Sequence, residues 1–473
     1  MTRRLQTAAL AFAVLQAACS FAPPYKVPQS AATPSVYKEA GEWKAAEPAD
    51  TAPKGAWWTA FGDAELNSLE SKAADANQSL KAGFARLQEA RADTRVARAD
   101  LFPTVSLQAS ALRSRASPNS PTYTPGKPTE GNDFNLEADV SYEVDLWGRV
   151  RNEIAAARAS QQASAADLDS LRLSIQAEVA TDYFGLRSYD MQQRLLDKTV
   201  ADYHQALDLT QALFDGGAAA LSDLEQAKAQ LHSAETQQAD IHLLRAQQEH
   251  AIGVLVGENP SLFKLAANPL PLDTAPPPVD AGMPSQLLER RPDVAEAERR
   301  VAAANAQIGV ARAAYFPQFS LGATGGFNST QASNWLTAPS LFWSLGPQVS
   351  LPIFEGGKLV AQTARAKAVY AEQVANYRNT VLTAYRDVED NLAALRQLAV
   401  ESETQRQAVE ASNIVLQKSQ DRYLAGLVTY LEVATSETTA LQAELSRINI
   451  QTRRLNAAVL LIKALGGGWN QSL

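Results

Sequence analysis

The amino-acid sequence predicts a mixed fold, in which two pairs of long coiled-coil helices alternate with two β-hairpins in two internal repeats. Three observations lead to this prediction. Proline is absent between Pro128 and Pro260 and again after Pro352, where the helix formers Ala, Gln, Glu and Arg are abundant. Two shorter stretches alternate apolar and polar residues with period two, which is typical of strands. Segments of the first half recur in the second half.

The N-terminus has the pattern of a secretory signal. The pair Arg3-Arg4 precedes an apolar run from Ala8 to Val14 that is too short to cross a bilayer as a helix. Cys19 is the only cysteine, so no disulfide can form within the chain. Its position resembles a bacterial lipoprotein cleavage site, although Gln16 stands where leucine is usual. We therefore expect a signal peptide at 1–18 and acylation of Cys19, the alternative being a lone cysteine that ends an ordinary signal.

The charge balance excludes one class of partner. The formal net charge is -8, whereas a protein that binds nucleic acid needs clustered Lys and Arg. Beyond the signal, no uninterrupted apolar run reaches the length of a membrane-spanning helix. If the mature chain crosses a bilayer, it must do so as strands of a closed barrel, because only helices and closed barrels pair every backbone group in lipid.

Glycine divides each proline-free segment into two helices. Gly216-Gly217 and Gly426 predict tight turns between an outgoing and a returning helix. The outgoing helices, Arg149 to Leu213 and Lys358 to Leu424, would each be about 100 Å long at 1.5 Å per residue. Apolar residues in the second helix follow three- and four-residue steps, which predicts a coiled-coil seam. The seam consists of Tyr370, Val374, Tyr377, Val381, Ala384, Val388, Leu392, Leu395 and Ala399.

Strict alternation predicts the strands. Between Phe134 and Leu146 every second residue is apolar, and carboxylates dominate the intervening positions. With the alternating run that starts at Val105, this stretch forms a hairpin at about 102–147, and a similar hairpin follows at about 316–354. Strands of this kind are typical of a transmembrane barrel. The alternative is a soluble sandwich.

Internal repeats relate the two halves of the chain. Residues 97–103, ARADLFP, recur as 311–317, ARAAYFP. Around the turns, residues 214–225 match 423–432 when Leu224-Glu225 is aligned with Leu431-Glu432. This alignment gives the first turn two extra residues. The repeats therefore predict two copies of a unit that consists of helices and one strand hairpin.

The repeats and the prolines define the domain boundaries. Residues 19–56 are expected to be the acylated N-terminus and an extended, Pro-rich tether. The first repeat spans 57–259 and the second spans 285–465, with a Pro-rich linker at 260–284 between them. Residues 466–473 form a C-terminal tail.

Three motifs together resemble one family over nearly the whole mature chain. Trp57, Trp58, Phe61 and Asp63 fit a Trp-Trp-x-x-Phe-x-Asp opening. Residues 287–293, LLERRPD, open the second repeat, and 180–187, ATDYFGLR, lie in the first long helix. These motifs resemble those of the TolC-like outer-membrane efflux factors, in particular the lipoprotein branch that serves RND-type drug pumps.

The resemblance implies a fold, a location and a function. It implies a homotrimer in which each chain gives four strands to a twelve-stranded barrel in the outer membrane, while the helices form a coiled-coil tunnel through the periplasm. The linker at 260–284 would surround the waist of that tunnel. Ser20 after the cysteine resembles the outer-membrane sorting signal of lipoproteins. The expected function is a passive export duct for drugs or other small toxic compounds, with a periplasmic adaptor, an inner-membrane RND pump and outer-membrane lipid as partners.

No enzyme chemistry or cofactor is expected. The four histidines lie in one helical hairpin without a carboxylate or cysteine in sequence to complete a metal site. They are His204, His232, His242 and His250. No phosphate-binding Gly-x-x-x-x-Gly-Lys occurs. Energy must therefore come from a partner protein.

The acidic strand face is the first candidate site. It contains Glu137, Asp139, Glu143 and Asp145. Inside a trimeric pore each charge would be tripled, which favours cations. The alternative is an ordinary solvated strand face.

The turns are the second candidate site. By resemblance, the small-Gly-apolar motif Ala425-Gly426-Leu427, and more loosely Gly216-Gly217, lies at the periplasmic tips where an adaptor docks. The alternative is that these glycines only cap helices. The family narrows its tunnel just beyond the second turn with an apolar residue and a carboxylate. Leu431 takes the first role, but Thr435 stands where the carboxylate is expected, which leaves Glu432 or Glu437 as substitutes.

Two other functions remain open at this point. One is an outer-membrane channel for heavy-metal efflux, although the strands contain no His and the chain has only three Met. The other is a structural coiled-coil lipoprotein without a pore.

Overall fold

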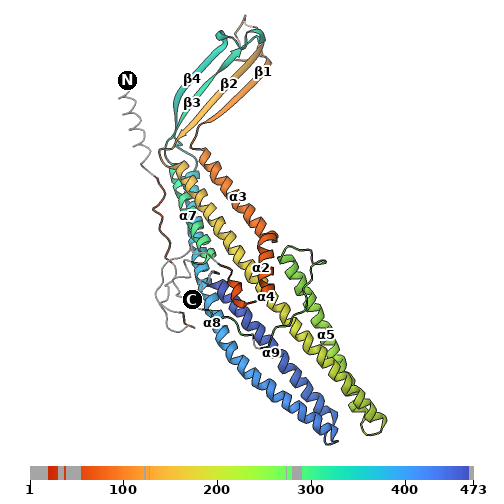
Figure 1. Cartoon of the computed structure of the whole chain (residues 1–473). Helices are drawn as coiled ribbons and strands as arrows, with labels where there is room; N and C mark the ends of the chain where they lie inside the picture. The colour runs from red at the N-terminus through yellow and green to blue at the C-terminus, as the bar shows by residue number, and fades with distance from the viewer. Residues whose placement is uncertain are drawn as a thin grey trace. The chain divides into compact units, whose positions relative to one another are not determined.

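The computed structural model describes residues 20–29, 37–38, 55–121, 124–126, 128–272, 274–279 and 290–467. Cys19 and the part of the C-terminal tail beyond 467 lie outside the described residues. The chain divides into two compact units. Figure 1 labels the helices and strands of both. The strand unit comprises Met1–Gln29, Arg86–Ala165 and Glu296–Tyr377, and the helical unit comprises Ser30–Ala85, Ala166–Ala295 and Arg378–Leu473.

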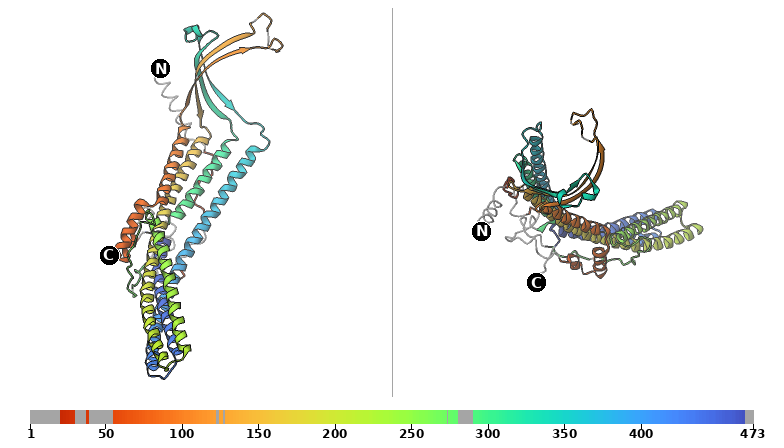
Figure 2. Two further views of the ribbon diagram at one scale, coloured as in Figure 1. Left: turned by 90° about the vertical axis from the view of Figure 1, so that its right-hand side faces the viewer. Right: turned by 90° about the horizontal axis from the view of Figure 1, so that it is seen from above.

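The strand unit contains one antiparallel sheet of four strands. The strands are β1 (Thr104–Arg115), β2 (Glu130–Val144), β3 (Gln318–Ser329) and β4 (Leu341–Ser350), in the order β1-β2-β3-β4. The two predicted hairpins are therefore joined through β2 and β3, one strand from each repeat. The sheet is curved when seen from above (Figure 2). β1 and β4 each have one edge without a partner strand within the described residues.

The register gives the sheet one apolar and one polar face. Val105 pairs with Val140, Leu136 with Phe327 and Ala323 with Leu345, so apolar residues of all four strands lie on the same side. A slip of one residue would move every apolar side chain to the other face, and this fixes the register. The apolar face is nevertheless exposed in the single chain. Its most exposed members are Val105, Leu107, Trp343 and Leu345, at 71 to 77 %.

The helices follow the proline and glycine pattern. They are α2 (Ala64–Ala76), α3 (Gln78–Ala99), α4 (Arg149–Asp215), α5 (Leu221–Leu255), α7 (Pro292–Ala313), α8 (Lys358–Leu424) and α9 (Tyr430–Ala464), with short 3-10 helices η1 (Trp57–Phe61), η2 (Ala332–Asn334) and η3 (Ala338–Ser340). None of the described helices combines the length and the apolar character that a membrane-spanning helix requires. The predicted mixed fold of long helices and four antiparallel strands is confirmed.

The two long helical hairpins are equal in length. α4 and α8 have 67 residues each, and α5 and α9 have 35 each. The expected two-residue insertion in the first turn is therefore wrong. The returning helices begin at Leu221 and Tyr430, so Leu224 aligns with Val433 and not with Leu431. Leu224 and Val433 are both buried. The two returning helices are therefore aligned correctly by their buried positions, and not by the matching Leu-Glu pairs.

The seam on α8 is buried over its central part. Tyr377, Val381, Ala384 and Val388 have little exposed surface. Further along, Leu398 is buried instead of the expected Ala399. An α-helix has 3.6 residues per turn, so a stripe of period 3.5 drifts around the helix over several turns.

The core of the helical unit forms around the first family motif. Trp57 of η1 and Leu66 of α2 are buried with Tyr183 of α4 and Leu455 of α9. Asp63 caps α2 by accepting from the N–H groups of Glu65 and Leu66, and it also accepts a 2.6 Å hydrogen bond from the Tyr183 hydroxyl. The Trp-Trp-x-x-Phe-x-Asp motif is therefore structural.

A buried ion network fastens the chain that follows α5. Arg187 is fully buried and donates to Asp190 at 2.7 Å and to the carbonyl of Ala266 at 2.8 Å. Asp190 also accepts from Arg245 at 2.7 Å and from the N–H of Asn268 at 3.0 Å. Removing one partner would leave a buried charge without compensation, which is strongly destabilising. The network therefore holds the start of the Pro-rich linker against α4 and α5.

Both helical turns have the same hydrogen-bond pattern. In the first, the N–H of Gly217 bonds to the carbonyl of Phe214, and that of Ala218 bonds to Leu213. In the second, Gly426 bonds to Tyr423 and Leu427 bonds to Arg422 in the same way. This is a Schellman motif, in which the glycine has positive φ, here 75° and 69°. The corresponding glycines are thus Gly217 and Gly426, while Gly216 corresponds to Ala425.

This geometry predicts opposite effects of two neighbouring substitutions. Gly217→Ala should loosen the turn by roughly 1 kcal/mol, because a Cβ disfavours positive φ. Gly216→Ala should have little effect, because alanine occupies the same place in the second turn. Hydrogen exchange at the amide of Ala218 should be about fivefold faster in Gly217→Ala only. Equal exchange in both variants would show that the left-handed backbone does not control the turn.

Candidate functional site

Two of the four predicted carboxylates on the polar face of the sheet, Glu137 and Asp139, are bound only by neutral groups. The Asn135 side-chain amide donates to Glu137 at 2.8 Å, and the Thr324 hydroxyl donates to Asp139 at 2.6 Å. Neither carboxylate forms an ion pair among the residues that the structure describes. Their charge is thus not compensated on this face.

The other two carboxylates of the predicted acidic face are in ion pairs. Arg149 binds both oxygens of Glu143 at 2.8 Å, and Gln318 donates to the same group at 2.9 Å. Asp145 accepts from the backbone N–H of Arg151 at 2.9 Å and from its guanidinium at 3.2 Å. The alternation alone did not distinguish these pairs from Glu137 and Asp139. The sequence did contain a signal for these ion pairs, because Arg149 follows Glu143 by the same spacing as Arg151 follows Asp145.

The N-terminal segment is docked where the strands meet the helices of the strand unit. The Ser20 hydroxyl donates to Asn152 at 2.8 Å, and the ring of Phe21 stacks on Phe316 with centroids 4.3 Å apart. Trp147 extends this aromatic cluster, 5.1 Å from Phe316. Further along, the Tyr25 hydroxyl binds Glu298 on α7. The residue that follows Cys19 is therefore held at one end of the sheet.

Aromatic residues also lie at the opposite end of the strands. Trp335 follows η2 and donates from Nε1 to the carbonyl of Phe327 at 3.3 Å. Its ring contacts Phe134, with centroids 5.6 Å apart. The apolar face is thus bounded by aromatic side chains at both ends.

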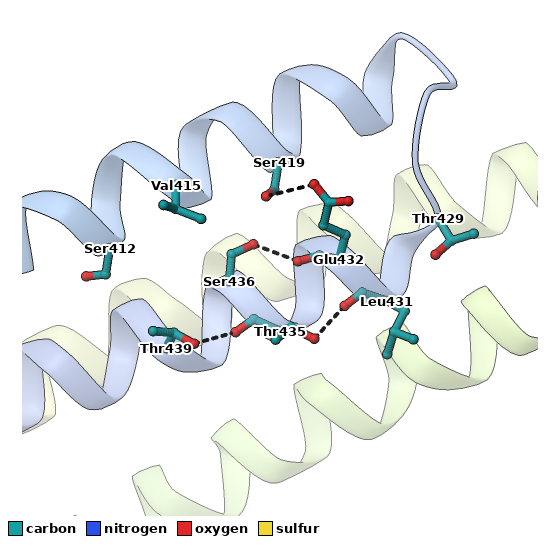
Figure 3. Close-up of a pocket in the computed structure, with 9 residues that line it drawn as sticks. All are labelled: Ser412, Val415, Ser419, Thr429, Leu431, Glu432, Thr435, Ser436 and Thr439. Atoms are coloured by element: carbon teal, nitrogen blue, oxygen red, sulfur yellow. Dashed lines mark hydrogen bonds between the residues drawn. The ribbon is translucent and has the colours of Figure 1, made fainter.

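The tip of the second hairpin contains a groove of about 490 Å³ between α8 and α9 (Figure 3). Hydroxyl side chains make up most of its lining, which consists of Ser412, Val415, Ser419, Thr429, Leu431, Glu432, Thr435, Ser436 and Thr439. Both predicted gate residues line it: Leu431 is 60 % exposed, and Glu432 binds Arg422 at 2.6 Å. Thr435 donates to the carbonyl of Leu431. Glu437 is buried, so it is not an exposed carboxylate of the groove.

The first hairpin differs at the corresponding positions. Tyr203 stands where the second hairpin has Ser412, and Gln230 stands where it has Thr439. Tyr203 is buried, and its hydroxyl accepts from Gln230 at 3.2 Å. The phenol ring therefore fills the space that remains open in the second hairpin.

Apolar side chains surround the second turn. Leu424, Leu427 and Leu431 are exposed, and they lie beside Ala425 and Gly426 of the predicted docking motif. An added Cβ on Gly426 would meet no atom within 4 Å. The turn thus presents an open apolar surface.

Two of the histidines meet a carboxylate that sequence reasoning missed. His232 binds Glu235 at 2.8 Å, and His204 lies 3.6 Å from the other oxygen of Glu235. The spacing of His232 and Glu235 on one helix was the available signal. No group of three or more His, Cys, Asp or Glu in the described part of the chain is arranged to hold a metal ion.

Comparison with known proteins identifies the family. The sequence matches the Outer membrane efflux protein family over residues 69–258 and 283–467. It is 32% identical over 473 residues to the antibiotic efflux pump outer membrane protein ArpC of Pseudomonas putida, covering 99% of this chain and 96% of that protein. It is 33% identical over 420 residues to the pyoverdine export outer membrane protein OpmQ of Pseudomonas aeruginosa, covering 87% of each.

A solved structure gives the same result. The Campylobacter jejuni outer membrane channel CmeC matches with a TM-score of 0.85 and 26% sequence identity, and the match covers 96% of each chain. Family membership makes this chain a component of an efflux system and not an enzyme. The chain belongs to the outer membrane efflux protein family.

Proposed function

We propose that this chain is the outer-membrane channel of a tripartite RND-type efflux system, a passive duct for drugs or other small toxic compounds from the periplasm to the exterior. The observation that carries the proposal is the sheet, which has an exposed apolar face, an acidic polar face and, among the described residues, two free edges. One relative named for antibiotic efflux and one named for pyoverdine export are almost equally similar to this chain. The similarity to these relatives therefore does not single out one exported compound for this chain.

Closure of the barrel requires more than one copy. About eight strands is the smallest number that closes a barrel around packed side chains, and each chain supplies four. Three copies, joined through β1 and β4, give twelve strands with no free edge. The apolar face then meets lipid, and the aromatic residues at both ends lie at the two membrane interfaces.

The N-terminus supports a lipid anchor at Cys19. Ser20 and Phe21 are docked beside Trp147 and Phe316, which lie at the end of the strands that leads into the helices. Under the proposal this end faces the periplasm, so an acyl group on the preceding cysteine would enter the inner leaflet of the outer membrane. Attachment of two or more acyl chains makes such anchoring stable.

The helices supply the tunnel and the docking surface. At 67 residues each, α4 and α8 extend about 100 Å at 1.5 Å per residue. The turns at Gly217 and Gly426 form their tips, and the second tip exposes Leu424 and Leu427. We assign the adaptor to these tips, and the RND pump, reached through the adaptor, supplies the energy.

The acidic face predicts a cation-preferring pore. In planar bilayers under a salt gradient, the reversal potential should indicate cation selectivity. Replacing Glu137 and Asp139 by Gln and Asn should reduce that selectivity, because these carboxylates have no cationic partner on the described strands. Glu130→Gln serves as the control, since Glu130 already pairs with Arg113 at 3.1 Å. Anion selectivity of the parent, or no change in the double variant, would contradict the assignment.

The docking surface predicts the effect of a bulky residue at the second tip. Gly426→Trp should assemble and insert normally, because the site is open, but should lose drug export and cross-linking to the adaptor. Gly126→Trp in the β1–β2 loop is the matched control, since Gly126 also has positive φ and open space around it. Drug-susceptibility assays and adaptor cross-linking would measure both. If export survives in correctly assembled Gly426→Trp, the glycine is only a helix cap.

A further inference from the structure

The hairpin tips enclose one carboxyl group that the docking and gate assignments do not use. Glu437 lies on α9, four residues beyond the buried Val433, and only 4 % of it is exposed. The Tyr430 hydroxyl donates to its Oε2 at 3.3 Å, and the side chain of Gln420 on α8 also binds it. Asp202 on α4 is the carboxylate whose charge acts on it.

No cation compensates Glu437 within the described residues. The groups that act on it are one carboxylate, one amide and two phenols: Asp202, Gln420, Tyr430 and Tyr203. The nearby basic side chains of the tips are engaged with other carboxylates: Arg422 with Glu432, Lys418 with Asp421, and Lys228 with Glu225. A negative charge on Glu437 would therefore be buried and unpaired, which is costly in a protein interior.

Glu437 lies where the two hairpins touch. Next to it on α9, the Thr438 hydroxyl accepts from Gln230 of α5 at 2.8 Å. The hydroxyls of Thr210 on α4 and Tyr423 on α8 are 3.4 Å apart. An apolar cluster joins the same helices and consists of Ala227, Tyr430, Val433 and Ala434, with Ala206, Leu207 and Tyr423 packed against it. The packed tip therefore surrounds the carboxyl with both hairpins.

Burial raises the pKa of Glu437 to about 7, from 4.5 for an ordinary glutamate. The hydrogen bonds from Tyr430 and Gln420 lower this pKa, and the charge of Asp202 raises it. The group therefore changes charge near neutral pH while the tip is packed. If the hairpins separate, water reaches the carboxyl and its pKa returns toward 4.5.

We propose that Glu437 is a pH-sensitive lock between the two hairpins of the tip: its neutral form keeps them packed, and its ionised form loosens them. The inference rests on the proposed function in one respect: if the chain forms a duct, loosening of the tips would widen its entrance. The buried carboxyl, its lack of a cationic partner among the described residues and its place between the hairpins carry it.

The direction of the pH effect follows from linkage. Below pH 4.5 the carboxyl is neutral in both arrangements, so the packing of the hairpins is at its strongest and does not change with pH. As the pH rises from 4.5 through 7, the separated arrangement loses its proton more readily, so the packed arrangement becomes less stable. Between about pH 5 and pH 8 the ratio of packed to separated tips should fall by roughly two orders of magnitude per subunit.

Cysteine cross-linking across the hairpins tests the lock. Gln230→Cys and Thr438→Cys put one thiol on each hairpin, at two positions whose native side chains are joined by a 2.8 Å hydrogen bond. Cys19 is the only native cysteine. The rate of cross-linking is measured between about pH 5 and pH 8 in this pair and in the same pair carrying Glu437→Gln. Thiols themselves react faster as the pH rises, so the two rates are compared at each pH. The ratio of the first rate to the second should fall with rising pH.

Two further variants serve as controls for the lock. Glu410→Gln removes an exposed carboxylate of α8 and should leave the profile of the cysteine pair unchanged. Tyr430→Phe removes a hydrogen bond that lowers the pKa of Glu437, so the midpoint of the profile should move to higher pH. This second variant keeps the test decisive if Glu437→Gln misfolds. Burial raises the pKa of Glu70 to about 9, so this other buried carboxyl titrates outside the range used.

Two results would overturn the lock. One is an identical pH profile with and without Glu437→Gln, and the other is an unchanged midpoint in Tyr430→Phe. Absence of conductance at every pH would instead refute the proposed channel, and the cross-linking result would still decide the lock.

Discussion

In a bilayer, every backbone N–H and C=O must find its partner within protein, and the architecture of this chain depends on that constraint. β2 and β3 are paired on both sides, whereas β1 and β4 are each paired on one side only among the described residues. The apolar face places the sheet in lipid, and lipid contains no water that could bind the unpaired backbone groups at the free edges of β1 and β4. Only further strands can, and under the proposed function these come from two more copies of the chain.

The two helical hairpins also come from the duplicated sequence, and they have the same backbone dimensions. α4 and α8 have equal lengths, and so do α5 and α9, with equal turns closed by Gly217 and Gly426. Equal hairpins place their tips at the same distance along the helices. The repeats then diverge in side chains: Tyr203 fills the first hairpin where Ser412 leaves a groove in the second. The two repeats thus share one backbone arrangement and differ in the side chains of their tips.

Much of the fold could be predicted from the sequence because periodicity reports burial directly. Alternation located the strands, and the absence of proline with single glycine turns located the helices. Pairing between β2 and β3 could not be read in this way, because period two specifies which face a residue takes and not which strand lies beside it. The burial of Glu437 likewise depends on neighbours in the other hairpin, which the period along its own helix does not specify.

The orientation of the two sheet faces is the central claim, and spin-label accessibility along β1 in a lipid bilayer tests it most directly. Labels at Val105 and Leu107 lie on the apolar face, and labels at Ser106 and Gln108 lie on the polar face. We expect collisions with dissolved oxygen to dominate at the first two positions and collisions with a water-soluble nickel chelate to dominate at the other two. Accessibility without two-residue alternation, or with the faces reversed, would contradict a barrel wall that separates lipid from an aqueous pore.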